Sequence, residues 1–73
     1  MKFCERLKEI RKSSSFTQKE LSVALGISLT AYQYYEAGKT EPNIENLIKL
    51  ANMFGVTLDY LMGRDESLAE HAD

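Results

Sequence analysis

Apolar residues recur along this chain at intervals of three and four positions, and no stretch alternates strictly between apolar and polar residues. Such intervals are typical of amphipathic helices, whereas a half-buried strand would place an apolar residue at every second position. Each of the four glycines follows such a segment, where glycine readily adopts the left-handed conformation that ends many helices. The pattern therefore predicts an all-α chain, with five helices in one compact unit.

The first helix is expected over about residues 2–13, because its apolar residues share one face. These are Phe3, Leu7 and Ile10. Three consecutive serines, at 13–15, then interrupt the helix, and Phe16 should pack into the core from the loop. We expect the only cysteine, Cys4, to be a buried or half-buried thiol on this helix.

Polar residues that cap helices stand before each later segment. Thr17 and Glu20 have the spacing of a capping box, in which each side chain accepts a hydrogen bond from the other residue's backbone N–H. Ser28 can cap a third helix that runs to about Glu36, and Thr57 can cap a short fifth helix.

The fourth helix is expected after Pro42 and Asn43, and its apolar stripe is broad. The stripe comprises Ile44, Leu47, Ile48, Ala51 and Phe54. The fifth helix should bury three residues: Leu58, Leu61 and Met62. Residues 64–73 have no clear apolar stripe and should fray, so we expect a domain over residues 1–64 and a tail over 65–73.

Residues 18–37 have the pattern of two short helices joined by a tight turn. Gly26 suits the turn, and the small Ser22 lets the two helices cross closely. Five apolar residues would fix the angle of the second helix of this pair: Leu21, Leu25, Ile27, Tyr32 and Tyr35. Its outer face would then be free to enter a groove of DNA.

The net charge of −2 looks unfavourable for a nucleic-acid-binding protein, but the charge is unevenly distributed. Residues 1–39 carry seven basic and four acidic side chains, whereas residues 65–73 carry four acidic and no basic ones. Because charges beyond about 8–10 Å are screened at physiological salt, DNA responds to the local potential. The charge therefore argues against strong non-specific binding and leaves specific binding open.

Other classes of function have little support in the sequence. A single cysteine excludes an internal disulfide, and the one histidine, His71, has no partner at nucleophile or metal-ligand spacing. We therefore expect no enzyme activity, no metal, no cofactor and no small-molecule ligand. No apolar run approaches the ~20 residues that span a membrane, and no signal peptide is visible, so a cytoplasmic protein is expected.

An ordered series of motifs resembles the phage repressor and Cro-type (Xre-type) helix-turn-helix DNA-binding domains. The series is 7–11 (LKEIR), 17–21 (TQKEL), 25–28 (LGIS), 35–39 (YEAGK), 41–42 (EP), 47–51 (LIKLA), 54–56 (FGV) and 57–63 (TLDYLMG). The chain departs from the family pattern at the serine run before the second helix, at Ser22, at Tyr32 and at Ala37. The resemblance implies a lambda-repressor-like five-helix domain in a transcriptional repressor of bacterial, phage or mobile-element origin.

The resemblance also implies a set of DNA contacts. Base contacts are expected from Ser28, Leu29, Thr30, Gln33 and Tyr34 of the third helix. Gln33 could pair with adenine and Leu29 could cover a thymine methyl group, which favours an A·T-leaning half-site. Backbone phosphates are expected to meet Gln18, Lys39, Thr40 and Asn43. Alternatively, Leu29 is merely an exposed apolar residue, Gln33 is an inert surface amide, and Tyr34 packs on the loop.

Two further expectations follow from the resemblance. Arg11 and Glu36 should form a partly buried ion pair that orients the recognition helix. A homodimer on a near-palindromic operator would use Tyr60, Met62 and Leu68 at its interface. The alternative function is a protein-interaction module or an antitoxin-like protein of the same fold, with weak or no DNA binding.

Overall fold

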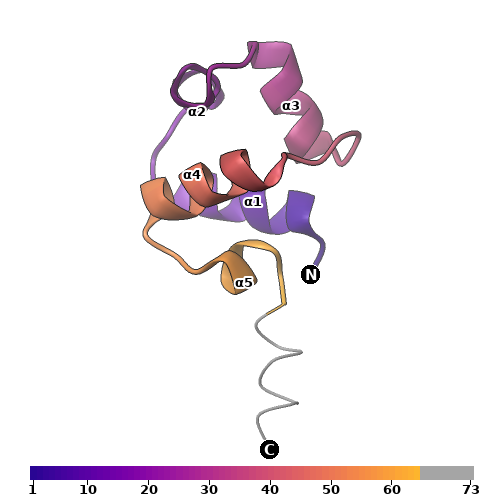
Figure 1. Cartoon of the computed structure of the whole chain (residues 1–73), viewed down its shortest axis with the longest axis vertical. Coiled ribbons are helices and arrows are strands. Elements are labelled where there is room, and N and C mark those ends of the chain that lie inside the picture. The colour runs from indigo at the N-terminus through magenta and orange to yellow at the C-terminus, as the bar shows by residue number, and fades with distance from the viewer. Residues whose placement is uncertain (65–73) are drawn as a thin grey trace, which may run out of the picture.

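The computed structural model describes residues 1–64, and within them the chain forms five α-helices and no strand (Figure 1). The helices are α1 (Phe3–Ser13), α2 (Gln18–Leu25), α3 (Leu29–Ala37), α4 (Ile44–Phe54) and α5 (Leu58–Leu61). The predicted all-α fold is therefore confirmed. The first helix begins at Phe3, because Lys2 has an extended backbone and donates its N–H to Glu5 Oε1 at 3.1 Å.

The capping residues predicted from the sequence set the starts of four helices. Thr17 Oγ1 accepts from the N–H of Glu20 at 3.0 Å, and the N–H of Thr17 donates to Glu20 Oε1 at 2.8 Å. Ser28 Oγ accepts from the N–H of Ala31 at 3.0 Å. Asn43 and Thr57 cap α4 and α5 in the same way. These bonds satisfy amides that have no partner within the helix.

Every helix contributes one fully buried hydrophobic side chain to a common core. The five residues are Leu7, Leu21, Tyr32, Leu50 and Leu61, in helix order. Phe16 packs against this core from the α1–α2 loop, and its ring meets that of Phe54 edge to face at 5.9 Å. The core therefore joins all five helices, and α2 and α3 are held as part of one body.

The sequence placed too many residues of α4 and α5 in the core. Ile44 is 73% exposed and Ile48 is 43% exposed, although both belong to the predicted stripe. The helix buries Ala51, which belongs to the predicted stripe, together with Leu50, which does not, and it leaves the two isoleucines exposed. Leu58 at the start of α5 and Met62 just after it are exposed, because a helix of four residues makes about one turn and points only Leu61 inward.

Arg6 is a buried charged residue that the apolar pattern did not predict. Its side chain crosses from α1 to α5, where Nη1 donates to the carbonyl oxygen of Tyr60 at 2.9 Å. The guanidinium also lies 3.9 Å from the centre of the Tyr60 ring, in a cation–π contact. Arginine is rarely buried unless it is paired, so its position in the sequence did not suggest a role in the core.

Ser15 has a backbone φ of +62°, in the left-handed region that favours glycine. We expect Ser15→Gly to raise the free energy of unfolding by about 0.5–1 kcal/mol, because the relief of this strain outweighs the added flexibility of the unfolded chain. The matched control is Ser14→Gly, at φ −90°, which should lower it. Urea denaturation of both variants tests this, and equal effects of the two changes would contradict it.

Candidate nucleic-acid interface

The turn between α2 and α3 is built on Gly26. Its φ of +71° ends α2 in the left-handed conformation after Leu25, and the N–H of Ile27 donates back to the carbonyl oxygen of Ser22 at 3.0 Å. Ser22 is buried, and its hydroxyl donates to the carbonyl oxygen of Lys19 at 2.7 Å. The predicted helix-turn-helix is therefore present, and α2 and α3 lie together at one end of the fold (Figure 1).

The third helix has a buried face and an exposed face. Tyr32 and Tyr35 are buried, with their ring centres 6.0 Å apart in an edge-to-face contact. On the other sides, Ser28, Thr30, Gln33 and Tyr34 are exposed, and Leu29 is half-buried. The buried tyrosines anchor the helix, so four of the five residues expected to contact bases are accessible and the fifth is partly so.

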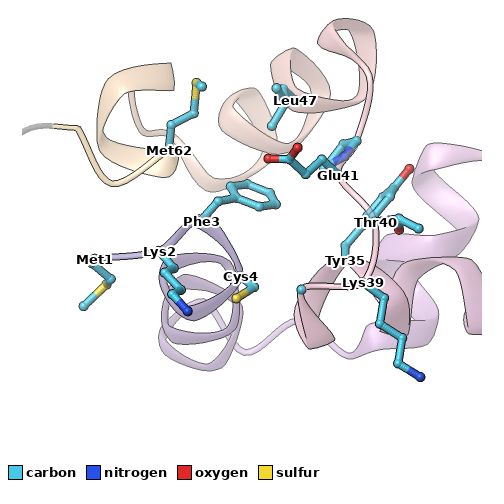
Figure 2. A pocket seen from close by; sticks show the side chains of 12 residues that line it. Met1, Lys2, Phe3, Cys4, Tyr35, Lys39, Thr40, Glu41, Leu47 and Met62 are labelled. Carbon is cyan, nitrogen blue, oxygen red and sulfur yellow. The ribbon is translucent and has the colours of Figure 1, made fainter.

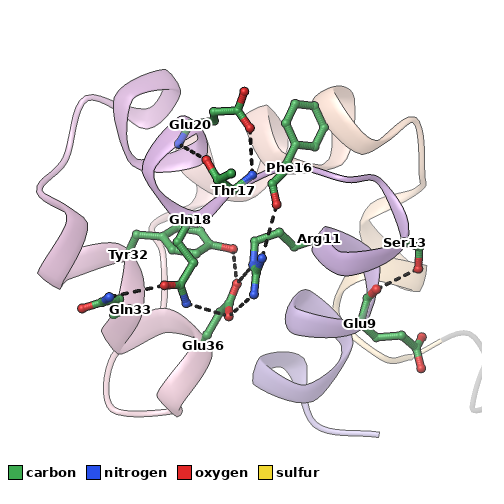
Figure 3. A network of polar contacts seen from close by, with 10 residues as sticks. All are labelled: Glu9, Arg11, Ser13, Phe16, Thr17, Gln18, Glu20, Tyr32, Gln33 and Glu36. Carbon is green, nitrogen blue, oxygen red and sulfur yellow. Dashed lines mark hydrogen bonds and ion pairs between the residues drawn. The ribbon is translucent and has the colours of Figure 1, made fainter.

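The carboxylate of Glu36 is the centre of a polar network that joins three helices (Figure 3). Arg11 donates to it twice, from Nε at 2.5 Å and from Nη2 at 3.2 Å. The Tyr32 hydroxyl donates at 2.7 Å, and Gln18 Nε2 donates at 3.1 Å. The ion pair implied by the family resemblance is present, whereas the contacts from Gln18 and Tyr32 were not predicted.

The network keeps Glu36 ionised although its side chain is only 3% exposed. Burial raises the pKa of this carboxyl, but the hydrogen bonds from Arg11, Tyr32 and Gln18 outweigh it, and the pKa is lowered overall. The hydrogen bond to Glu36 raises the pKa of Arg11, while burial raises that of Tyr32. At neutral pH the pair is therefore charged and the phenol neutral.

The four residues expected to contact phosphates lie at the start of α2 and between α3 and α4. Gln18 is the first residue of α2, where free backbone N–H groups favour an anion. Lys39 and Thr40 are exposed in the loop after α3, and the Lys39 ammonium lies 5.2 Å from the centre of the Tyr34 ring. Asn43 is exposed, but its Oδ1 already accepts from the N–H of Asn46, so its NH₂ group is what it can offer a phosphate.

A surface hollow lies beside the loop between α3 and α4. It is bounded by the start of α1, by α4 and by the end of α5 (Figure 2). Its lining includes Phe3, Leu47 and Met62 on one side and Lys39 on the other. At Gly38 (φ +75°), an added Cβ would come within 3.2 Å of the half-buried Cys4 Sγ. The absence of a side chain at this position therefore lets the loop pack closely on α1.

The residues expected at a dimer interface are only partly described. Tyr60 and Met62 are each slightly more than one-third exposed, near the carboxyl end of the described chain. Leu68 lies outside the described residues. Within residues 1–64, no helix combines the length and apolar character needed to cross a bilayer, and no cluster of three or more metal-ligating side chains occurs.

Comparisons with known proteins agree with this geometry. A family model described as Helix-turn-helix matches residues 7–61. The cryptic phage CTXphi transcriptional repressor RstR of Vibrio cholerae is 44% identical over 64 residues, which are 88% of this chain and 57% of that protein. The chain thus spans little more than half the length of this relative.

Solved structures resemble the fold over most of its length. The P22 c2 repressor, crystallised with a synthetic operator, matches with a TM-score of 0.79 and 34% identity over 89% of this chain and 98% of that one. A transcriptional regulator from Listeria innocua matches with a TM-score of 0.81 and 30% identity, over 97% of this chain and 72% of that one.

Proposed function

The chain belongs to the helix-turn-helix family, and on that basis we propose that it is a sequence-specific, double-stranded DNA-binding transcriptional regulator that acts as a repressor. The observation that carries this proposal is the seating of α3, whose two tyrosines are buried while its outer face is exposed. A helix held in this way can enter the major groove as a rigid body. Such a repressor would act in the cytoplasm of a bacterial cell.

In this proposal α3 reads base edges through mixed chemistry. Gln33 can pair with adenine through N6 and N7, and Thr30 can bond several base edges. Leu29 can cover a thymine methyl group. Ser28 and Tyr34 are the first and the last of the five residues proposed to contact bases. The helix has no arginine, the residue that most often recognises guanine, which supports a half-site rich in A·T pairs.

Phosphate contacts would fix the register of the protein on DNA without reading sequence. Gln18 would contribute at the start of α2, and Lys39, Thr40 and Asn43 would contribute from the loop between α3 and α4. We also propose a homodimer on a near-palindromic operator, supported by the exposure of Tyr60 and Met62. Two α3 helices one turn of DNA apart would be separated by about 34 Å.

The affinity for selected DNA should fall steeply with salt. Sites are obtained by selection from a random pool, and binding is measured by gel shift at several salt concentrations with competitor DNA. If a dimer neutralises about 6–8 phosphates, log K should fall with log salt at a slope of about −5 to −7. A slope near zero would contradict the phosphate contacts. Sedimentation of the complexes should find two chains per duplex, and a single chain would contradict the dimer.

The second candidate is a protein-interaction module or an antitoxin-like protein that retains the fold. The net charge of −2 and the exposure of Tyr34 on α3 favour it, since an acidic chain with an exposed aromatic residue suits a protein partner. The same gel shift separates the two functions. Binding that survives competitor DNA supports the regulator, whereas no binding at low salt supports the protein-only function.

A further inference from the structure

A continuous chain of polar side chains runs from the ion pair to the exposed face of α3 (Figure 3). Arg11 donates to Glu36, and Gln18 Nε2 donates to Glu36 Oε1 at 3.1 Å. Gln33 Nε2 then donates to Gln18 Oε1 at 3.3 Å. Gln33 is exposed, so this chain connects a buried charge with a side chain on the surface proposed to read bases.

The charge on Glu36 sets the direction of every hydrogen bond in this series of side chains. An ionised carboxylate can only accept, so Gln18 must turn its NH₂ group toward Glu36. The carbonyl oxygen of Gln18 therefore points the other way. Since that oxygen can only accept, Gln33 must meet it with its own NH₂ group.

This direction determines what Gln33 can offer a base. One of its two N–H groups is used by Gln18, which leaves the other N–H and the carbonyl oxygen Oε1. One donor beside one acceptor matches adenine, which presents the N7 acceptor and the N6 amino donor in the major groove. Guanine presents two acceptors, N7 and O6, so the carbonyl oxygen of Gln33 would face another acceptor.

We infer that Gln18 is a positioning residue that holds the Gln33 amide in the orientation that selects adenine over guanine. The inference rests on the proposed function, and it adds a role for Gln18 distinct from a phosphate contact. An unattached glutamine can rotate its amide and turn both N–H groups toward guanine. The ion pair of Arg11 and Glu36 thus influences base selection through two side-chain amides.

The test measures base preference separately from affinity. Operators are prepared with adenine or guanine at each position, and the position read by Gln33 is the one whose preference Gln33→Ala abolishes. There, the unaltered chain should prefer adenine by about tenfold or more. Gln18→Met should reduce this preference to less than about threefold, while preferences at other positions stay unchanged. Because Arg11 and Tyr32 still hold Glu36, α3 should stay seated, as a thermal melt checks.

The matched control is Lys39→Met, which removes a proposed phosphate contact outside this chain of hydrogen bonds. It should weaken binding to all operators equally and leave the preference for adenine intact. In a Gln33→Ala background, Gln18→Met should likewise cause only a uniform loss. A Gln18→Met protein with unchanged preference for adenine would overturn the inference while leaving the proposed function in place.

Two other outcomes also decide the matter. If Gln33→Ala alters the preference at no position, Gln33 does not read a base and the inference is wrong. If the unaltered chain binds no DNA selectively, the proposed function fails and the inference fails with it. In the free protein, NMR couplings and amide exchange of Gln33 equal to those of an unattached glutamine would overturn the inference without any variant.

Discussion

Replacing Arg11 with methionine is expected to lower the free energy of unfolding by about 3–5 kcal/mol. The change removes both guanidinium donors and leaves the Glu36 carboxylate charged in a site where it is 3% exposed. Small domains are stable by only a few kcal/mol, so this loss should be visible as a large drop in the midpoint of thermal or urea denaturation. DNA binding should fall with it, because Glu36 lies on α3.

The double variant Arg11→Met, Glu36→Gln separates a stranded charge from a lost contact. A neutral amide at position 36 leaves no buried charge, and its carbonyl oxygen can still accept from the Tyr32 hydroxyl. We therefore expect the double variant to recover most of the stability that Arg11→Met loses. If the double variant is as unstable as the single one, packing by the arginine stem is the larger contribution. If Arg11→Met leaves stability and DNA binding unchanged, the pair has no structural role.

The unaltered chain and the Arg11→Met variant should also differ in how their stability depends on pH. In the unaltered chain the pKa of Glu36 is lowered on folding, so its stabilising contribution is present above the unfolded pKa of about 4.3 and is lost as pH falls through the folded value. Without Arg11, burial should raise that pKa, and protonation would then relieve the variant. The gap in stability between the two proteins should therefore begin to shrink above the unfolded pKa of about 4.3, as pH falls through the raised pKa of Glu36 in the variant, and should go on shrinking until pH passes the lowered pKa in the unaltered chain. A constant gap would contradict a role for charge.

Local signals accounted for most of the fold. The helix boundaries followed from residues whose side chains act on backbone amides within three positions, as Thr17, Ser28 and Asn43 do. Such contacts depend only on residues that are close in the sequence, so they can be predicted from a single sequence. The turn at Gly26 was predictable for the same reason, because its conformation depends on the residue that occupies it.

Burial was harder to predict, because it depends on what covers a residue from elsewhere in the chain. Ile44 and Ile48 fit an apolar stripe of α4, but both remain exposed in the folded chain. Arg6 shows the reverse case, since a charged residue is buried through its contact with Tyr60, 54 positions away. The periodicity of one helix cannot reveal either outcome.

In the candidate site, too, some features could be predicted from the sequence and others could not. The family resemblance identified the pair Arg11 and Glu36, and its motifs located α3 as the helix with the outer face. The bonds that Gln18 makes with Glu36 and Gln33 were not foreseen, although all three residues had been singled out. These contacts depend on the angle at which α2 crosses α3, and residue types alone do not specify it.

The remaining large effect should come from a negative charge on the exposed face of α3. Thr30→Glu places a carboxylate where the proposed groove brings phosphates and base acceptors close, and like charges in contact cost several kcal/mol. We therefore expect selected DNA to bind at least about 100-fold more weakly, with thermal stability little changed because Thr30 is exposed. The control Asn52→Glu adds the same charge at an exposed position of α4 and should reduce binding far less. Equal losses in the two variants would mean that net charge, and not the position of α3 on the DNA, determines affinity.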